Sequence, residues 1–333
     1  MIYNYTNDDL KLKDTNEELN YRFKYIPIHL NVIFNGTYQK FKETYLTQEL
    51  VDEIYKVIET EEIDQEIVIL DFNNIMGVES RVFEKFKSFQ GERYILFINL
   101  GTLCYKNIIL TDLKDRITSE ESLNIAYFNN SKDRIMSMFS TNNIEAEIEN
   151  LKNRIVASYL YNNKEDNNSE LESTPVKSNI YINIKAIFSS VKIYLLVIYI
   201  LCEKINNSIE LKDIKAFVSV NNNSAILSCL IGQILDKESL YLINLGPNIT
   251  LKNRAIIDKL VAKKKYVLVF DFICLGTEYK LAKTILDIKE AKLELAVGVS
   301  SFINLEIKDK VKNIFLVNDE NVVDFKYSIC VTD

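Results

Sequence analysis

An acidic residue, a glycine and a threonine follow one another where a predicted buried strand ends. The apolar run 266–272 contains Asp271, and Gly276, Thr277 and Glu278 then lead into a predicted helix. Backbone N–H groups, a hydroxyl and the positive end of a helix dipole can together hold a phosphate. The same residues also suit a plain strand end followed by a helix cap. The segment predicts a phosphate-binding site, with an ordinary turn as the alternative.

Strands and helices alternate through the second half of the chain. This alternation favours a mostly parallel sheet flanked by helices. Ligands bind beyond the carboxyl ends of the strands in such a sheet, which is where the Asp271 segment lies. The predicted strands are 180–184, 216–220, 240–245, 266–272, 293–299 and 313–317, and the predicted helices are 187–205, 225–235, 252–261 and 278–289.

The order of these segments resembles that of type I phosphoribosyltransferases, orotate phosphoribosyltransferases among them. The strand and loop around Asp271 resemble the family's phosphoribosyl-diphosphate-binding motif, and 173–185 resembles the Ser-rich turn and Tyr-containing strand that open the family's domain. Asn222, Asn223 and Ser224 stand where the family has its diphosphate-binding loop. The resemblance implies a phosphorylated ribose ligand that brings Mg²⁺ near Asp271, with no metal held by the protein alone.

Several departures from the family pattern bear on catalysis. Phe272 replaces the second of two adjacent acidic residues, and a phenyl ring cannot accept a hydrogen bond. The 221–224 loop has no glycine, which crowds a close approach of phosphate to the backbone. The family's basic pair is absent at 243–244, with Lys252 and Arg254 as candidate replacements. Because cationic groups stabilise the departing diphosphate, the pattern favours binding over transfer.

The first half of the chain also alternates strands with helices. Apolar runs predict strands at 23–34, 66–72 and 94–100, and helical spacing predicts helices from Thr47 to Ile58 and over 80–88. Residues 131–160 are predicted to be largely helical, and the polar stretch 162–169 is predicted to be a linker.

The stretch from Val68 to Ser80 resembles the core of STAS domains, the fold of anti-sigma-factor antagonists. In that family a hydrophobic strand ends in an aspartate, here Asp71, and an acidic residue followed by a serine opens a helix, here Glu79 and Ser80. Ser80 stands where many members carry a phosphorylatable serine, and an ordinary helix N-cap is the alternative. STAS domains are mainly interaction and sensing modules, so the resemblance implies a protein partner.

Composition limits the remaining classes. The length of 333 residues favours two domains, and the net charge of −7 argues against nucleic-acid binding. The five cysteines are scattered without a CxxC pair, which argues against zinc or disulfides and favours a reducing cytoplasm. We expect no signal peptide and no membrane span. The single histidine, His29, falls in a predicted strand, and it excludes a site built from several histidines.

The sequence therefore predicts a two-domain α/β protein. Its parts are a tail over 1–22, a STAS-like domain over 23–130, a helical connector and polar linker over 131–174, and a phosphoribosyltransferase-like domain over 175–333.

The expected function is that of a cytoplasmic regulatory or sensing protein. It binds a phosphoribosyl or nucleotide ligand through the second domain and a protein partner through the first, and a homodimer is a further option. Two alternatives stay open: an active phosphoribosyltransferase with a nucleobase-like acceptor, and a non-catalytic partner protein of a bacterial stress or defence system.

Overall fold

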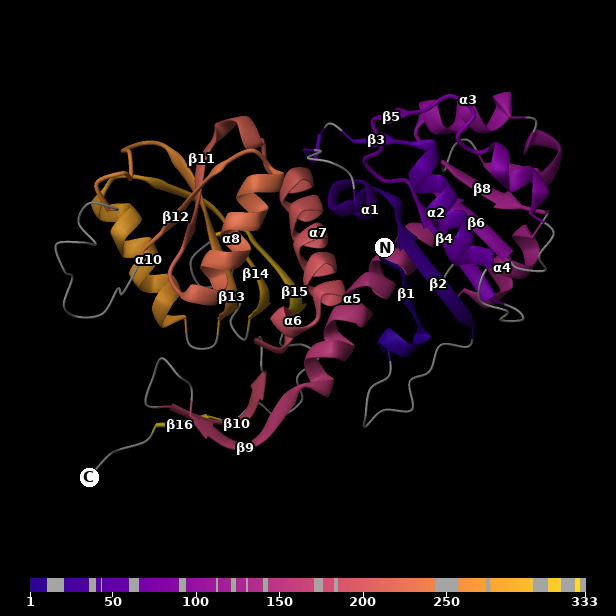
Figure 1. Cartoon of the computed structure of the whole chain (residues 1–333). Helices are drawn as coiled ribbons and strands as arrows, with labels where there is room; N and C mark the ends of the chain where they lie inside the picture. Colours follow the sequence, from indigo (N-terminus) through magenta and orange to yellow (C-terminus); the bar gives the residue numbers. More distant parts are fainter. Residues whose placement is uncertain are drawn as a thin grey trace. The chain divides into compact units, whose positions relative to one another are not determined.

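The chain forms two compact units, Met1–Ile155 and Val156–Asp333, and the division falls inside one helix (Figure 1). Each unit has a mixed α/β structure with parallel strands, as predicted for the α/β class. The computed structural model describes residues 1–10, 21–35, 40–42, 44–59, 66–89, 94–111, 113–120, 124–129, 131–139, 143–170, 176–182, 185–242, 257–273, 276–301, 311–318 and 327–329.

The main sheet of the first unit has the strand order β1-β2-β4-β6-β8-β7. Its central strands β2 (Arg22–Pro27), β4 (Glu66–Asp71) and β6 (Tyr94–Ile98) are parallel. Strand β4 is buried along its whole length, as its continuous apolar run predicts. The outer strands β1 (Tyr5–Thr6), β8 (Ile125–Phe128) and β7 (Ile117–Glu120) pair antiparallel.

Helices and a small ribbon complete this unit, and the last of these helices continues into the second unit. The α-helices are α1 (Ile28–Asn35), α2 (Gln48–Glu59), α3 (Thr102–Leu110), α4 (Lys132–Met138) and α5 (Ile144–Asn162). The 3-10 helices are η1 (Asn7–Leu10), η2 (Glu84–Ser88) and η3 (Leu113–Arg116), and the ribbon pairs β3 (Tyr45–Leu46) with β5 (Gly77–Val78).

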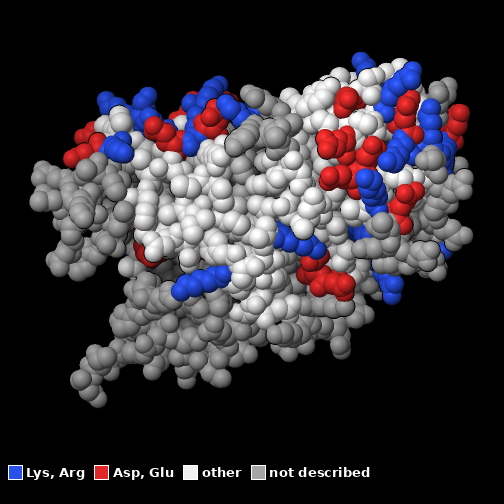
Figure 2. Space-filling view, viewed as in Figure 1, with Lys and Arg blue, Asp and Glu red and all other residues white. Residues whose placement is uncertain are grey.

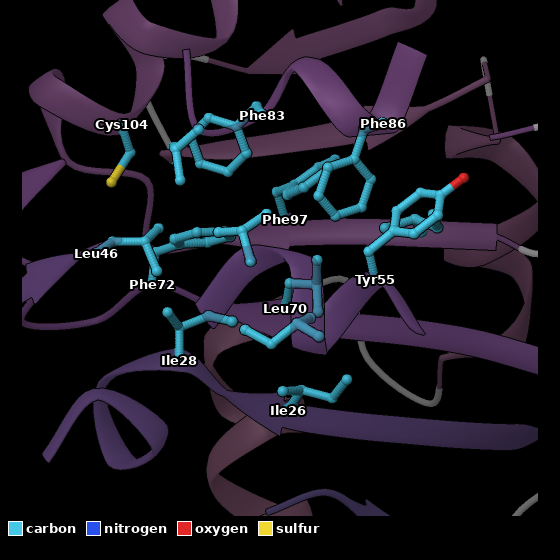
Figure 3. Close-up of a cluster of buried hydrophobic side chains, with 14 of the residues drawn as sticks. Ile26, Ile28, Leu46, Tyr55, Leu70, Phe72, Phe83, Phe86, Phe97 and Cys104 are labelled. Carbon is cyan, nitrogen blue, oxygen red and sulfur yellow. The ribbon is translucent and has the colours of Figure 1, made fainter. Parts of the chain in front are cut away.

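Aromatic side chains fill the core between the sheet and the segments α2 and η2 (Figure 3). The ring centroid of Phe97 lies 5.9 Å from that of Phe72 and 5.7 Å from that of Phe86. Tyr55 of α2 meets Phe86 edge-on at 5.7 Å. Edge-to-face and tilted ring contacts at these distances stabilise a core beyond the area that they bury.

Two local predictions for this unit are wrong. The apolar stretch 23–34 is a strand only as far as Pro27, so His29 lies in helix α1. Burial lowers the pKa of His29 to about 4. Residues 80–83 form turns instead of a helix start, because Arg81 has a φ of 59°, which interrupts a right-handed helix. Helical structure resumes only in η2.

The second unit is built on a five-stranded parallel sheet with the order β12-β11-β13-β14-β15. Figure 1 shows α10 on one face of this sheet and α7 and α8 on the other. The strands are β11 (Ile214–Ser219), β12 (Glu238–Tyr241), β13 (Lys265–Ile273), β14 (Lys292–Ser301) and β15 (Asn313–Asn318). The helices are α6 (Lys185–Ser189), α7 (Val191–Ser208), α8 (Asn222–Ile234) and α10 (Thr277–Ile288), with the 3-10 helix η5 (Leu211–Asp213).

The polar stretch predicted as a linker forms a strand. β9 (Lys164–Glu170) pairs antiparallel with β10 (Val176–Ile182), and β16 (Tyr327–Ile329) pairs with the other edge of β10. Backbone pairing satisfies the peptide groups whatever the side chains are, so a polar composition does not preclude a strand. Only Ile257 to Val261 of the predicted helix 252–261 are among the described residues, and 243–244, Lys252 and Arg254 lie outside them.

The chain reverses direction across the sheet next to β11. It passes from β11 to β12 on one side, and β13 then lies on the other side of β11. The helices that follow β11 and β13 therefore lie on opposite faces, and both begin at the same edge of the sheet. Such a topological switch point is where open parallel sheets bind ligands.

In the described part of the chain, none of the helices has the length and apolar character needed to cross a bilayer.

Candidate functional site

Helix α8 begins at the switch point with a capped, asparagine-rich turn. Asn221 is its N-cap, and Asn221 Oδ1 accepts a hydrogen bond of 2.8 Å from the backbone N–H of Ser224. In return, Ser224 Oγ accepts one of 3.2 Å from the backbone N–H of Asn221. This capping box uses the oxygen of the Asn221 amide. The NH₂ group of the same amide is thereby turned towards β13.

Asp271, near the end of β13, receives two of these amides. Asn221 Nδ2 donates to Asp271 Oδ1 over 2.9 Å, and Asn223 Nδ2 donates to Asp271 Oδ2 over 3.1 Å. The aspartate is 7% exposed. A buried carboxylate needs hydrogen-bond donors, and here both oxygens receive one from a neutral group.

A second carboxylate shares the same amide. Asn221 Nδ2 also donates to Glu278 Oε2 over 3.1 Å, so its two protons bridge Asp271 and Glu278. Burial raises the pKa of Glu278, and the nearby Asp271 raises it too, while the hydrogen bond from Asn221 opposes them. The two carboxylates therefore repel each other across one amide group, and this repulsion disfavours the charged form of Glu278.

Tyr241, the last residue of β12, contributes a further polar side chain to this edge of the sheet. Its hydroxyl donates to Asn222 Oδ1 over 2.6 Å. Burial raises the pKa of Tyr241, and the neighbouring Glu278 adds to the effect. Residues that end β11, β12 and β13 and begin α8 and α10 thus surround one edge of the sheet.

The predicted phosphate cradle lies at the start of α10. Gly276 is the N-cap with a φ of 76°, a left-handed conformation that favours glycine, and its carbonyl accepts from the backbone N–H of Lys280. Thr277 is exposed in the first turn. The first N–H groups of a helix have no intrahelical acceptor and suit an anion. Cys274 lies outside the described residues.

A further buried hydroxyl lies near this edge. Ser300 on β14 is 1% exposed, and its register partner on β13 is Phe272, next to Asp271. Ser300 Oγ has no hydrogen-bond partner among the residues described. Because buried polar atoms are normally paired, this hydroxyl is a candidate partner for a further polar group at this edge.

The carboxylates at this edge differ from Asp71 of the first unit in whether a cation lies beside them. Within the described ranges, neither Asp271 nor Glu278 forms an ion pair, and no group of three potential metal ligands occurs. Asp71, at the end of β4, lies 3.7 Å from Lys152 Nζ and accepts from Tyr25 Oη and Asn99 Nδ2 at 2.8 Å each. Over the described part of the face in Figure 2, acidic and basic side chains are intermingled.

The structure brings the predicted ligand residues Asp271, Glu278, Asn222 and Asn223 to one edge, where Ser224 serves as a cap. Gly276 and Thr277 start the adjoining helix. The sequence-based prediction placed Asn221 in the diphosphate-binding loop but not among the ligand-binding residues, and it did not include Tyr241. An Asn with Ser three residues later before an apolar helix could have indicated Asn221 as a cap. No local signal could have indicated Tyr241, because its contact is with a residue 19 positions earlier.

In the first unit, the residues of the STAS-like pattern, Asp71, Glu79 and Ser80, have different environments. Ser80 is exposed in a turn and is not a helix N-cap, contrary to the alternative considered from the sequence. Glu79 instead caps a helix: its Oε2 accepts 2.7 Å from the backbone N–H of Gln48 at the start of α2. Asp71 is fully buried.

Comparison with known proteins gives only structural similarities. No protein-family model and no curated protein matches the chain. The similar solved structures include the adenine phosphoribosyltransferase of Rhodothermus marinus (12% identity, 51% of this chain and 99% of that chain, TM-score 0.40). They also include the orotate phosphoribosyltransferase of Aeropyrum pernix (14% identity, 48% and 89%, TM-score 0.38). A third is the Trypanosoma brucei adenine phosphoribosyltransferase, solved with AMP, pyrophosphate and ribose-5-phosphate (12% identity, 46% and 75%, TM-score 0.36).

Proposed function

We propose that this protein is a regulatory or sensing protein whose second unit binds the ribose of a nucleotide-type ligand at the edge formed by β11 and β13. The observation that carries the proposal is the bridge Asp271–Asn221–Glu278, in which one amide holds two carboxylates side by side. Carboxylates are strong acceptors for hydroxyl groups, and two adjacent ones match the vicinal hydroxyls of ribose.

Glu278 can replace the second acidic residue that the sequence lacks at position 272. Phe272 removes the second of two adjacent acidic residues, which would leave one ribose hydroxyl without an acceptor. Glu278 supplies a second carboxylate from the first turn of α10, and its hydrogen bond to Asn221 brings it beside Asp271. A ligand hydroxyl would replace the Asn221 bond on one carboxylate oxygen.

The first unit is the proposed interaction module. Ser80 is exposed on a turn whose backbone is fixed by neighbours, since the Glu79 carbonyl accepts from Asn107 Nδ2 over 2.8 Å. A phosphate on Ser80 would add negative charge beside Glu79 and change what that surface binds. Ligand binding in the second unit is proposed to regulate this interaction.

Isothermal calorimetry with ribosyl ligands tests the binding. The panel contains adenosine, uridine, their 5′-monophosphates, ribose-5-phosphate and phosphoribosyl diphosphate, each with and without Mg²⁺. Asp271→Asn removes the charge from one hydroxyl acceptor and should weaken binding about 10- to 100-fold, because a hydrogen bond to a charged group contributes roughly 1.5–3 kcal/mol.

Glu294→Gln is the matched control. Glu294 is a half-buried acid near the amino end of β14, where it pairs with Lys265 at 3.0 Å, so its loss should leave affinity unchanged. Absence of binding across the panel, or equal affinity of the Asp271→Asn variant, would refute the proposal. A diphosphate-release assay with nucleobases separates binding from transfer.

Regulation is tested separately by hydrogen exchange. Addition of a ligand that binds should change amide exchange in residues 1–155, including the turn at Ser80. A change confined to residues 156–333 would show that the second unit binds without signalling to the first.

A further inference from the structure

The two asparagines that donate to Asp271 differ in how many neighbours hold them. Asn221 Nδ2 lies 2.9 Å from Asp271 Oδ1 and 3.1 Å from Glu278 Oε2, and the oxygen of the same amide accepts the Ser224 backbone N–H that caps α8. Among the residues that the structure describes, the side chain of Asn223 makes one hydrogen bond, from Nδ2 to Asp271 Oδ2 over 3.1 Å. Rotation of Asn223 therefore breaks one bond, whereas movement of the Asn221 amide breaks three.

The start of helix α8 does not require an asparagine at position 223. Asn223 belongs to the first turn of the helix, and the capping box is made by Asn221 and Ser224. Asparagine is a poorer helix former than alanine, because its side chain competes with the backbone for hydrogen bonds. The contact with Asp271 is thus the role that the structure gives to the Asn223 amide.

We infer that Asn223 competes with a ribose hydroxyl for Asp271 Oδ2 and thereby limits how tightly the site binds its ligand. The inference rests on the proposed binding of ribose and names the residue that regulates it. Asp271 is 7% exposed, so a hydroxyl that reaches Oδ2 needs space that a neighbouring donor fills. Asn223 is the donor that leaves at the lower cost, while the cap of α8 keeps Asn221 on Oδ1.

The size of the effect follows from an exchange of neutral donors. An amide and a hydroxyl both donate to a carboxylate without changing its charge, so the exchange does not depend on the charge of the rest of the ligand. The hydrogen bond gained from the ligand is offset by the bond that Asn223 gives up. A hydrogen bond to a charged group corresponds to about 10- to 100-fold in an equilibrium constant, and water replaces part of a missing amide. We expect removal of the amide to tighten binding about tenfold.

Calorimetry of the full chain with the Asn223→Ala variant tests the competition. Adenosine, uridine and their 5′-monophosphates are titrated in the presence of Mg²⁺, and those that bind the parent should bind the variant about tenfold more tightly. The 2′,3′-dideoxy counterparts have no ribose hydroxyl for Asp271, so their affinity should change by less than about twofold. Gln233→Ala, at an exposed position of the same helix, is the matched control and should leave every affinity unchanged.

A double-mutant cycle without ligand measures the contact itself. Asn223→Ala, Asp271→Ala and the double variant are compared with the parent by urea unfolding. The two side chains should be coupled by about tenfold in the unfolding equilibrium constant. The better helix propensity of alanine is present with and without Asp271, so it cancels in the cycle.

Each result decides the inference. It is overturned if Asn223→Ala binds the ribosyl ligands no more tightly than the parent, if the dideoxy ligands gain as much as the ribosyl ones, or if the cycle shows no coupling. A ligand that binds only the variant supports it. If neither protein binds any of these ligands, the proposed function is refuted and the inference falls with it.

The two kinds of failure are therefore distinct. Binding to the parent without a gain in Asn223→Ala leaves the proposed function intact and removes only the competition.

Discussion

Replacing Asn221 with serine isolates the bridge between the two acids. Serine is as good an N-cap as asparagine, so the start of α8 is kept. The side chain of serine is too short and has too few donors to reach Asp271 and Glu278 as Asn221 does at 2.9 and 3.1 Å. The variant therefore loses the bridge and keeps the cap.

The size of the expected loss of stability follows from the burial of the two carboxylates. Removing the donor to Asp271, which is 7% exposed, should cost roughly 1.5–3 kcal/mol, because the acceptor is charged and buried. The donor to Glu278 contributes less, since that residue is only half-buried. We expect Asn221→Ser to lower the free energy of unfolding by about 2–3 kcal/mol at pH 7. Asn221→Ala should cost about 1 kcal/mol more, because it also removes the cap.

The loss of stability caused by Asn221→Ser should depend on pH. The pKa of Glu278 is raised in the folded protein, so the folded state holds this proton more tightly than the unfolded chain does. Ionisation of Glu278 therefore costs stability as the pH rises above about 4.3, the usual value for a glutamate. Without the Asn221 bond the pKa rises further. The loss of stability caused by Asn221→Ser should thus be smaller at pH 5 than at pH 7, because more of Glu278 is protonated at the lower pH.

Urea unfolding followed by far-UV circular dichroism measures these differences. If the two units unfold in separate transitions, only the transition of the second should move. The double variant Asn221→Ser/Glu278→Gln should recover part of the loss, because it removes the repulsion. A serine variant as stable as the parent, or one with the same penalty at pH 5 and pH 7, would contradict the bridge.

Three further outcomes can be measured by chemical denaturation. Lys152→Met should lower the free energy of unfolding by about 3–5 kcal/mol, because Asp71, whose carboxylate lies 3.7 Å from Lys152 Nζ, would become a buried charge without its cation. Neutralising Asp71 in a double variant should recover part of the loss. Gly298→Ala should cost about 1–3 kcal/mol, because the new Cβ would lie 2.6 Å from the carbonyl oxygen of Phe270. Glu79→Ala should lower the free energy of unfolding by up to about 1 kcal/mol, because it removes the acceptor for the Gln48 backbone N–H at the start of α2.

Regular elements with strong local patterns were predictable from the sequence. The runs that form β4 and β13 are continuous and apolar because both faces of those strands are covered. Prediction failed where backbone conformation decides the outcome. Arg81 takes a positive φ that no periodicity reveals, and β9 is a strand because a neighbour pairs with it despite its polar sequence.

The candidate site was predictable only in part for a similar reason. Asp271, Gly276, Thr277 and Glu278 are close in sequence, so one strand-loop-helix pattern finds them together. Asn221 lies 50 residues before Asp271, and only the order of strands in the sheet brings the two together.

The two central aspartates show why one edge is a candidate site and the other is structural. Asp71 and Asp271 both stand at the carboxyl end of a central parallel strand, and each accepts from an asparagine that follows a neighbouring strand, Asn99 and Asn221 respectively. Asp71 is fully buried and has Lys152 as counter-charge, so its charge is already balanced within the fold. Asp271 is instead joined through Asn221 to a second acid, an arrangement that costs stability at neutral pH. Stability alone does not explain such a pair, whereas hydroxyl donors from a ligand would stabilise both carboxylates at once.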